Sequence, residues 1–585
     1  MALSVLALGL YGLATLQVSS AASASASTST SSDADSNYCP VINSGDSSGC
    51  SPLPPNFLSG PDGGASAAAE PNAQILKDAF NALAVLQNEY FNPARMTWPS
   101  AIDWTAAVVQ TIVSGSMSTL SRSIDSADSY ADWKEKENLL SFLHEQVVSA
   151  YFGQDTEAIK GQAYDDILWV VLGWVEAMNF RRLHEELHYP KGGHDDKLLP
   201  RDLSKAVESM PWHGQFWTGT FAHRAEDFWN LGMEGWDTTL CHGGMIWNPR
   251  LEPYKNAITN ELYISASISM YRYFPGSTYD GTSSRNPRHL QAAIEGYKWL
   301  RDVNMTNDQG LYVDGYHVNH DIPGNVECDV RDEMVYTYNQ GVVLTGLRGL
   351  FGVTGAPSYV EDGHNLIRSV IKATGWDIKR GELVDDAPPP GELPPWHGIG
   401  RGGILEESCD ASGTCSQDGQ TFKGIFMHHL SAFCRPLELT VDESRVSLNA
   451  EALAQVKQAH AKTCRSYIGW LKYNAEAAMR TRDDKGRFGM WWAANLYNQV
   501  NVPRSDDGID HFAPNTTDYR NEGTPQNALW SEQERFIPGG GNATAQAAGR
   551  APSGDPNDRG RGRTVETQTG GLSLLRAYWE VSQAS

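Results

Sequence analysis

Amphipathic helical patterns recur along most of this chain and are separated by loops rich in glycine and aromatic residues. Apolar residues in these stretches return every three to four positions, which is typical of helices that bury one face, whereas strand-like alternation is sparse. The pattern predicts helices at 73–90, 104–120, 130–151, 165–188, 255–274, 288–303, 333–351, 359–374, 422–434, 448–474 and 564–580. We therefore expect an all-α fold.

No second break in composition divides the region 71–585, so these helices are expected to belong to one large domain. Single compact cores usually stop growing well before this size. A closed ring of helical hairpins allows one domain of this size, because its buried surface is distributed around the ring and does not form one large core. The irregular stretches 385–403 and 498–563 interrupt the helices and are predicted to be surface loops.

The amino terminus has the features of an export signal. Residues 3–16 are apolar but too few to span a bilayer, and small residues follow at 20–26. We predict a signal peptide over 1–22 and, from its Ser, Ala, Gly and Pro content, a disordered linker over 23–70. Three glycosylation sequons begin at Asn304, Asn515 and Asn542. These features predict a secreted glycoprotein, and no apolar tail suggests stable membrane insertion or a lipid anchor.

Eight cysteines agree with an oxidising destination. Cys39 with Cys50, and Cys409 with Cys415, are close enough in sequence to close small loops. Eight cysteines nevertheless permit about 105 pairings, and spacing alone does not choose among them.

The charge of the chain limits its partners. It carries 46 basic and 70 acidic side chains, a net charge of −24, which repels nucleic acid and anionic lipid. The basic residues Arg559, Arg561 and Arg563 are expected to lie in a solvated loop. With 18 Trp and 23 Tyr, the composition instead favours a neutral ligand such as a sugar, whose rings stack on flat apolar faces.

Asp165 and Asp166 are adjacent acids at the start of a strongly apolar, tryptophan-containing helix. Burying neighbouring carboxyl groups raises the pKa of at least one of them, so that a proton donor and a nucleophile can coexist near neutral pH. Retaining glycosidases hold two carboxyl groups roughly 5–5.5 Å apart, which consecutive residues at a helix start could supply. The alternative is a helix N-terminus whose acids complement the positive end of the dipole.

Several downstream loops join polar and aromatic side chains to helix starts. In the glycine-rich segment 241–249, Trp247 offers a stacking face and Asn248 offers hydrogen bonds, and Asn256 follows shortly after. Further along, Asp314, Tyr338 and Asn339 lie in similar loops. Each of these six residues is a candidate for binding substrate, although each could instead be a core aromatic or a helix cap.

In their order and in their residues, these segments resemble the motifs of glycoside hydrolase family 76, which comprises endo-α-1,6-mannanases and cell-wall transglycosylases. The resemblance runs from about Trp98 to Ala577. It implies an (α/α)6 barrel, retention of configuration, and no metal or cofactor. Asp165 resembles the nucleophile and Asp166 the general acid/base. The family more often has two tryptophans where this chain has Ile246 and Trp247.

The resemblance implies a secreted enzyme, in part associated with the cell wall, that acts as a monomer on α-mannan. Asp166 would protonate the glycosidic oxygen while Asp165 attacks the anomeric carbon, and water or a sugar hydroxyl would resolve the intermediate. Hydrolysis and transglycosylation share the first step, so both remain open. A wall-binding protein that has lost its chemistry is the non-enzymatic alternative.

A zinc protease is a rival interpretation, because His184, Glu185 and His188 match the H-E-x-x-H pattern and Glu208 follows. We expect these histidines instead to occupy a solvated helix end near the negative pole of the dipole. Other histidines without convincing ligand sets are His317, His320, His428 and His429.

Two further motifs carry little weight. Residues 45–49 fit the G-x-S-x-G pattern but lie in the linker, and the glycine-rich 398–403 lacks the strand that a dinucleotide site requires. The neighbouring acids Glu406 and Glu407 are expected in a solvated loop.

Overall fold

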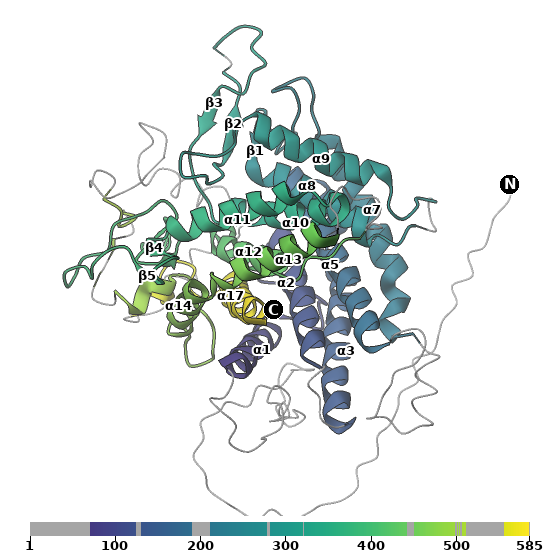
Figure 1. Cartoon of the computed structure of the whole chain (residues 1–585), viewed down its shortest axis with the longest axis horizontal. Coiled ribbons are helices and arrows are strands. Elements are labelled where there is room, and N and C mark those ends of the chain that lie inside the picture. The colour runs from purple at the N-terminus through teal and green to yellow at the C-terminus, as the bar shows by residue number, and fades with distance from the viewer. Residues whose placement is uncertain are drawn as a thin grey trace, which may run out of the picture. The chain divides into compact units, whose positions relative to one another are not determined.

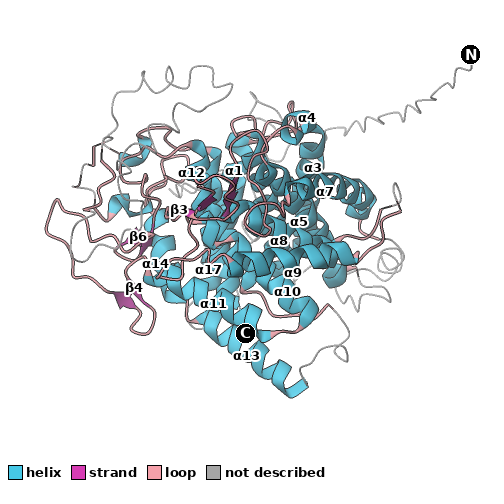
Figure 2. Cartoon of the chain, turned by 90° about the horizontal axis from the view of Figure 1, so that it is seen from above, coloured by secondary structure: helices cyan, strands magenta, loops and turns pink. Residues whose placement is uncertain are grey.

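The computed structural model describes residues 71–124, 130–189, 211–277, 281–319, 321–440, 450–497, 500, 502–503, 506–510 and 555–583. The predicted signal peptide and linker lie outside the described residues. So do Cys39, Cys50, the 45–49 motif, Glu208, His320, Asn515 and Asn542. Helices dominate the described part of the chain (Figure 2).

Six helices form a closed inner ring in which each contacts the next and the last contacts the first. In ring order they are α2 (Asp103–Ser123), α5 (Tyr164–His188), α8 (Ala257–Tyr273), α10 (Val342–Thr354), α12 (Gln417–Phe433) and α17 (Val565–Gln583). α8 and α10 are apolar around much of their circumference, as helices covered on all sides must be.

The inner helices run parallel to one another. Thr105 donates to Glu566 at 2.8 Å near the start of α2 and α17, and Thr119 donates to Glu580 at 2.5 Å near their ends. His428 on α12 likewise faces Arg576 on α17, each near the end of its helix. All six N-termini therefore meet at one end of the ring and all six C-termini at the other.

Close approach between inner helices depends on small residues. A Cβ atom added to Gly424 on α12 would lie 3.0 Å from the Cα of Gly570 on α17. A larger residue at Gly424 would therefore push the two helices apart. The sequence thus encodes ring closure at the contact between two glycines.

An outer layer covers the ring and completes an (α/α)6 barrel. Its helices are α1 (Pro71–Tyr90), α3 (Tyr130–Gly153), α7 (Thr218–Gly232), α9 (Pro287–Asp302), α11 (Pro357–Lys372), α13 (Ala450–Arg465) and α14 (Ile468–Met479), with the short α4 (Thr156–Lys160) beside α5. α1 packs on α17, so the first and last described helices lie side by side (Figure 1). The predicted fold class is confirmed.

The predicted helices differ from the structure in three places. Residues 333–341 precede α10 and contain only a short 3-10 turn, Tyr338–Gln340. There the Thr337 backbone N–H donates to the Glu407 carboxylate, and the Gln340 side-chain amide donates to the Tyr312 carbonyl. The single helix predicted over 448–474 is two, α13 and α14, with a break at 466–467. α7 was missed, although its buried residues do recur at helical spacing.

The short strands lie in loops between helices. β1 (Tyr254–Asn256), β2 (Gly315–His317) and β3 (Val330–Asp332) form an antiparallel sheet with Asn256 opposite Gly315 and Gly315 opposite Asp332. Two hairpins complete the set, β4 (Trp376–Asp377) with β5 (Glu382–Leu383) and β6 (Gly400–Arg401) with β7 (Ile404–Leu405). Because β1 leads directly into α8, the three-stranded sheet lies at the N-terminal end of the ring.

Three disulfides join described cysteines: Cys241 to Cys328, Cys409 to Cys415 and Cys434 to Cys464. The bond between Cys409 and Cys415 is one of the pairings that the sequence left open. Within the described residues, no helix combines the length and apolar composition that crossing a membrane requires.

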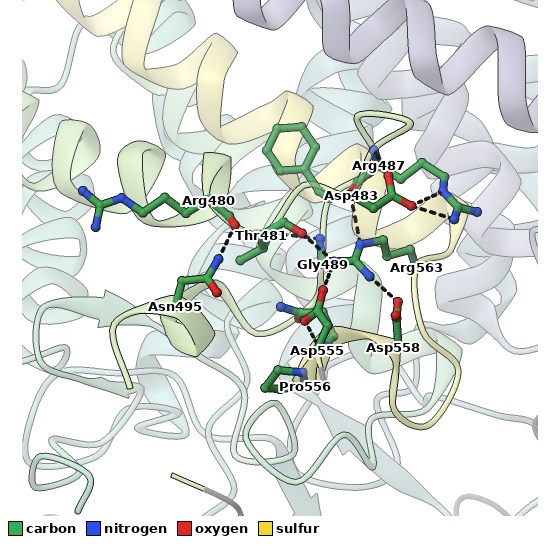
Figure 3. Close-up of polar contacts among 12 residues, drawn as sticks. Arg480, Thr481, Asp483, Arg487, Gly489, Asn495, Asp555, Pro556, Asp558 and Arg563 are labelled. Carbon is green, nitrogen blue, oxygen red and sulfur yellow. Dashed lines mark hydrogen bonds and ion pairs between the residues drawn. The ribbon is translucent and has the colours of Figure 1, made fainter. Parts of the chain in front are cut away.

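The prediction that Arg563 lies in a solvated loop is wrong. Its side chain is 2% exposed and bonds Asp555 at 2.5 Å, Asp558, and the carbonyl oxygens of Thr481 and Arg487 (Figure 3). Arg563 immediately precedes the start of α17, so this network anchors the loop that leads into the last inner helix.

Candidate active site

Asp165 and Asp166 lie in the first turn of α5, at the end of the ring where the six N-termini meet. Asp165 is partly exposed, and its carboxylate accepts hydrogen bonds from the Trp247 indole at 3.1 Å and the Asp166 backbone N–H at 3.1 Å. The Tyr164 N–H donates to the Trp247 carbonyl at 2.9 Å. The start of α5 and the loop that carries Trp247 are therefore joined by two hydrogen bonds, one of which is made by Asp165.

The loop that carries Trp247 is firmly supported. Buried Lys255 donates to the carbonyl oxygens of Asp237, Leu240 and Gly243 and lies 3.0 Å from the Asp237 carboxylate. The 241–328 disulfide fixes the start of the loop. We expected its glycines to let backbone amides approach a ligand. In the structure Gly244 has a positive φ of 89° and packs against Trp299, where a Cβ would come within 2.4 Å of the ring.

Asp314 is a second half-buried acid at this end of the ring. It accepts hydrogen bonds from the Tyr254 hydroxyl at 2.7 Å and the Asn339 amide at 3.4 Å. Tyr254 also meets the Trp247 ring edge-on, with centroids 6.4 Å apart, and stacks on His317. Tyr254 therefore connects the loop that holds Asp165 to the strand that holds Asp314.

Burial raises the pKa of Asp165 to about 7, and the nearby carboxyl of Asp314 raises it further, against the opposing hydrogen bonds from Asp166 and Trp247. Burial likewise raises the pKa of Asp314 to about 7, with Asp332 adding to the effect. The prediction treated Asp165 as the ionised member of its pair, so its raised pKa is a difference from that prediction. The charge of Asp314 thus acts on Asp165, and the charge of Asp332 acts on Asp314.

Aromatic side chains line the same end of the ring. Tyr338 stacks on Phe422 with centroids 3.9 Å apart and an interplanar angle of 7°. Burial, followed by the charges of Asp314 and Asp165, raises the pKa of the Tyr338 phenol well above its ordinary value. Trp104 stacks on Trp169 and donates to Asp418 in the first turn of α12. Partly exposed Tyr338 therefore presents a flat face beside Asp165 and Asp314.

Two of the six predicted binding residues have structural duties. Asn256 is buried and caps α8 by accepting from the Thr259 N–H at 3.3 Å. Asn248 accepts from the Arg250 N–H at 3.0 Å in a turn. The other four lie nearer the acids. Trp247 donates to Asp165, Asn339 donates to Asp314, and Tyr338 stacks on Phe422 at the same end of the ring.

The sequence analysis missed several acids that surround this site. Asp332 on β3 was not singled out, and burial raises its pKa. Glu261 is fully buried on α8, where burial raises its pKa well above the usual range and Asp314 adds to the effect. The available signal for Glu261 was a lone acid among apolar residues in α8, a pattern that is costly without a purpose.

The prediction that Glu406 and Glu407 lie in a solvated loop is wrong, since both are buried. Glu407 accepts hydrogen bonds from the backbone N–H and hydroxyl of Thr337, the residue before Tyr338. Glu406 binds Arg401 and the Trp491 indole, each at 3.1 Å. Glu407 therefore anchors the loop that carries Tyr338.

The two histidines of the H-E-x-x-H pattern are buried, so the prediction of a solvated helix end is wrong. His184 lies 2.9 Å from the Ser121 hydroxyl through Nδ1 and 3.0 Å from Glu137 through Nε2, and His188 Nε2 lies 3.0 Å from the Ser121 carbonyl. Both imidazoles are thus committed to protein partners. His428 and His429, also buried, bond Arg576 and Thr345.

Three groups of described side chains are close enough together to hold a metal ion, and none includes Asp165 or Asp314. They are His364 with His460 and Cys464, His144 with Glu145 and His213, and Cys409 with Asp410 and Cys415. The cysteines in the first and last groups are disulfide-bonded, which removes their thiolates as ligands.

Comparison with known proteins gives a consistent set of relatives. The sequence profile of glycosyl hydrolase family 76 matches residues 218–501. Mannan endo-1,6-alpha-mannosidase DFG5 of Saccharomyces cerevisiae is 25% identical over 308 residues, which cover 51% of this chain and 58% of the relative. Mannan endo-1,6-alpha-mannosidase DCW1 of Candida glabrata is 24% identical over 227 residues, 38% of this chain and 42% of the relative. The alignments thus span about half the length of these curated relatives.

Two solved structures align over most of the chain. A family 76 mannosidase from Bacteroides thetaiotaomicron has 13% identity and a TM-score of 0.47, covering 87% of this chain and 98% of the other. Dfg5 from Chaetomium thermophilum in complex with glucosamine has 13% identity and a TM-score of 0.46, covering 88% and 91%.

Proposed function

This chain belongs to glycosyl hydrolase family 76, and from that premise we propose that it is a secreted, retaining, endo-acting glycosidase of α-1,6-mannosidic linkages. The names of the fungal relatives, mannan endo-1,6-alpha-mannosidases, support the substrate class. The chain's net charge of −24 agrees with a neutral polysaccharide rather than a polyanion.

One observation carries the proposal: Asp165 stands at the start of α5 with its pKa raised to about 7 by burial, and the Trp247 indole donates to it at 3.1 Å. A buried carboxyl whose pKa is raised toward neutral, and which a second acid flanks, is characteristic of a catalytic site. As the nucleophile, Asp165 must react in its ionised form, which the hydrogen bond from the Trp247 indole favours. A merely structural helix-start acid would gain nothing from a second half-buried acid, Asp314, close by.

The mechanism has two displacements. Asp165 attacks the anomeric carbon of an α-mannosyl unit, the bond to the leaving oxygen breaks, and Asp166 gives its proton to that oxygen. Asp166, now ionised, takes a proton from the incoming water, whose oxygen displaces Asp165 from the anomeric carbon. For the first step Asp165 must be ionised, and we assign Asp314 to hold the proton that these two acids share near neutral pH.

A sugar hydroxyl in place of water would make the same enzyme a transglycosylase. The two activities differ only in which acceptor reaches the intermediate, and Tyr338 stacked on Phe422 offers a platform on which an acceptor sugar could rest. We propose hydrolysis as the principal activity, acting as a monomer. The zinc protease finds no support, because His184 and His188 are bonded to Ser121 and Glu137.

The test is incubation of the full chain with a defined linear α-1,6-mannooligosaccharide, followed by sizing of the products. Shorter products report hydrolysis, longer ones report transfer, and NMR of the first product reports whether the α configuration is retained. The Asp166→Asn variant should lose turnover with oligosaccharide. With an activated α-mannoside, azide should restore turnover and give the α-mannosyl azide if Asp166 is the acid/base, whereas a β-mannosyl azide would identify Asp166 as the nucleophile. Unchanged oligosaccharide after long incubation with wild-type protein would leave only the wall-binding alternative.

A further inference from the structure

A small cavity of about 40 Å³, open to solvent on one side, lies within the inner ring far from Asp165. Its lining comes from α5, α8, α10, α12 and the residues that follow α12, and includes Glu176 and Asn179. Glu176 lies eleven residues beyond Asp165 on α5, a rise of about 16 Å along the helix. The cavity therefore belongs to the C-terminal end of the ring, not to the candidate active site.

Three arginines face this cavity: Arg272 at the end of α8, Arg348 on α10 and Arg435 just after α12. Among the described residues, several of their N–H groups are buried without a hydrogen-bond partner, namely Nε and Nη2 of Arg272, Nε and Nη2 of Arg435, and Nε of Arg348. On the acceptor side, Oε1 of Glu176 in the same lining is also without a hydrogen-bond partner. Unused buried donors are costly, and charged ones more so. So many on one cavity wall indicate a missing acceptor.

The nearby acids do not supply that acceptor. Glu176 is the acid that lines the cavity, and its carboxylate lies 3.8 Å from Arg435, beyond hydrogen-bond distance. Glu580 lies 3.9 Å from Arg435 and is bonded to Arg122 and Thr119 instead. Burial and, after it, the charge of Arg272 together lower the pKa of Arg348 to about 10, so these two arginines repel each other. At Arg435, burial opposes the charge, but Glu580 and Glu176 raise the pKa above its ordinary value.

Helix dipoles explain only part of this arrangement. Cations are favoured at helix C-termini because the last carbonyl oxygens are partly negative. Arg348 does donate to the carbonyl of Pro436 at 2.6 Å. Arg272 instead lies over the Tyr273 ring, with 4.8 Å between its guanidinium carbon and the ring centroid, and its buried N–H groups remain unused.

We propose that this cavity binds a small oxyanion of the phosphate class between Arg272, Arg348 and Arg435. Guanidinium groups match the tetrahedral oxygens of phosphate with paired hydrogen bonds. An anion would accept from the unused N–H groups and reduce the repulsion among the three cations, while Asn179 offers a further polar contact. The anion could be free phosphate or the phosphate group of a phosphorylated sugar.

The experiment titrates the full chain with sodium phosphate, and separately with glucose 6-phosphate, by isothermal calorimetry against sodium chloride at matched ionic strength. We expect saturable binding of phosphate and a rise in the melting temperature. Arg272→Gln should weaken binding by about tenfold or more, since it removes two donors and a charge. Arg348→Lys keeps the charge but loses the guanidinium fork, and should weaken binding as well. Arg288→Gln, on the exposed side of outer helix α9, is the matched control and should bind as wild type.

Binding of phosphate but not glucose 6-phosphate would identify the free ion as the ligand, and binding of both would admit the sugar phosphate. Without phosphate, Arg272→Gln should melt no lower than wild type, because it removes a repelling charge that makes no hydrogen bond. The proposal is overturned if wild-type protein shows no saturable phosphate binding, or if Arg272→Gln binds phosphate as tightly as Arg288→Gln does.

Discussion

The two ends of the helical ring place charge in opposite ways. At the N-terminal end, Asp165 and Asp314 are half-buried acids with no cation partner among the described residues, and the pKa of each is raised to about 7. At the C-terminal end, burial opposes ionisation of Glu580, yet Arg122 and Arg435 hold its pKa at about 2. The parallel ring makes this possible, because helix N-termini tolerate anions and C-termini tolerate cations.

This difference shows that the acids at the N-terminal end lower the stability of the fold, whereas the acid at the C-terminal end raises it. An acid with a raised pKa is held at a cost to the fold, which is characteristic of sites that do chemistry. An acid with a lowered pKa contributes stability through its partners. The same residue type therefore has opposite roles at the two ends, and substitutions can test each.

The largest expected effect is at the N-terminal end. Asp165→Asn should lower kcat/KM on an α-1,6-mannooligosaccharide by about three orders of magnitude or more, because it removes the nucleophile. It should also raise the melting temperature at pH 8. Asp165 binds its proton more tightly when folded, so its contribution to stability falls as pH rises from its unfolded pKa of about 4 to its folded pKa of about 7. Asparagine removes that loss.

Asp227→Asn is the matched control, because Asp227 is an exposed acid on outer helix α7 whose partner is Lys160. It should leave both kcat/KM and the melting temperature near wild type. If Asp165→Asn retained wild-type turnover, or melted lower than wild type at pH 8, the contrast between the two ends would disappear.

The C-terminal end should respond in the opposite sense. Glu580→Gln leaves the cations of Arg122 and Arg435 without their shared carboxylate, and should lower the free energy of unfolding by about 3 kcal/mol. Since the folded pKa of Glu580 lies below the unfolded one, this contribution is complete above about pH 4 and is lost as pH falls toward 2. Urea unfolding at pH 7 and pH 3 measures both.

Turnover by Glu580→Gln, assayed well below its melting transition, should stay close to wild type, because the residue is remote from Asp165. Glu186→Gln, which breaks an exposed pair with Arg182, should change stability by less than about 0.5 kcal/mol. If the two substitutions lowered the free energy of unfolding equally, the buried ion pairs of Glu580 would contribute no more to stability than an exposed pair does.

The same contrast explains what the sequence could and could not predict. Helical periodicity was sufficient for the ring, and adjacent acids at the start of an apolar helix were sufficient to select Asp165. Asp332 and Glu261 were missed, because only the antiparallel sheet and the closure of the ring bring them to Asp314 from distant parts of the chain. Their place in the site depends on tertiary packing, which local pattern does not encode.

Charged residues in loops were the most frequent errors. Glu407 and Arg563 have the sequence context of solvated loops, yet each is buried against a backbone segment that it holds in place. His184 was likewise expected at an exposed helix end. In each case a partner far away in sequence, such as Thr337 or Ser121, makes burial favourable, and no window of the sequence contains both members of the pair.

A smaller effect at the N-terminal end isolates the hydrogen bond to Asp165. Trp247→Phe keeps an aromatic ring but removes the indole N–H, and should lower kcat by about 10- to 100-fold with a smaller change in KM. Trp217→Phe, at a partly exposed position beside Phe216, should leave both parameters unchanged. A change confined to KM would mean that Trp247 binds sugar without supporting the nucleophile.

The smallest expected effect is a shift in pH dependence. Because Asp165 must be ionised to attack, kcat/KM should fall as pH drops through about 7. Asp314→Asn removes the like charge that raises the pKa of Asp165, so the acidic limb should move to lower pH, by about one unit. This shift is small compared with the loss of activity in Asp165→Asn. It nevertheless distinguishes an Asp314 that acts on the pKa of Asp165 from an Asp314 that only binds sugar, which activity at a single pH does not.

Asn339→Asp provides the opposing variant, since it adds an acid next to Asp314 and should move the limb to higher pH. If Asp314 only bound sugar, its replacement would raise KM and leave the limb in place. A limb that moved in opposite directions for the two variants would show that the acids at the N-terminal end share protons. This sharing is what separates them from Glu580, whose charge is fixed by arginine at every pH at which the fold is stable.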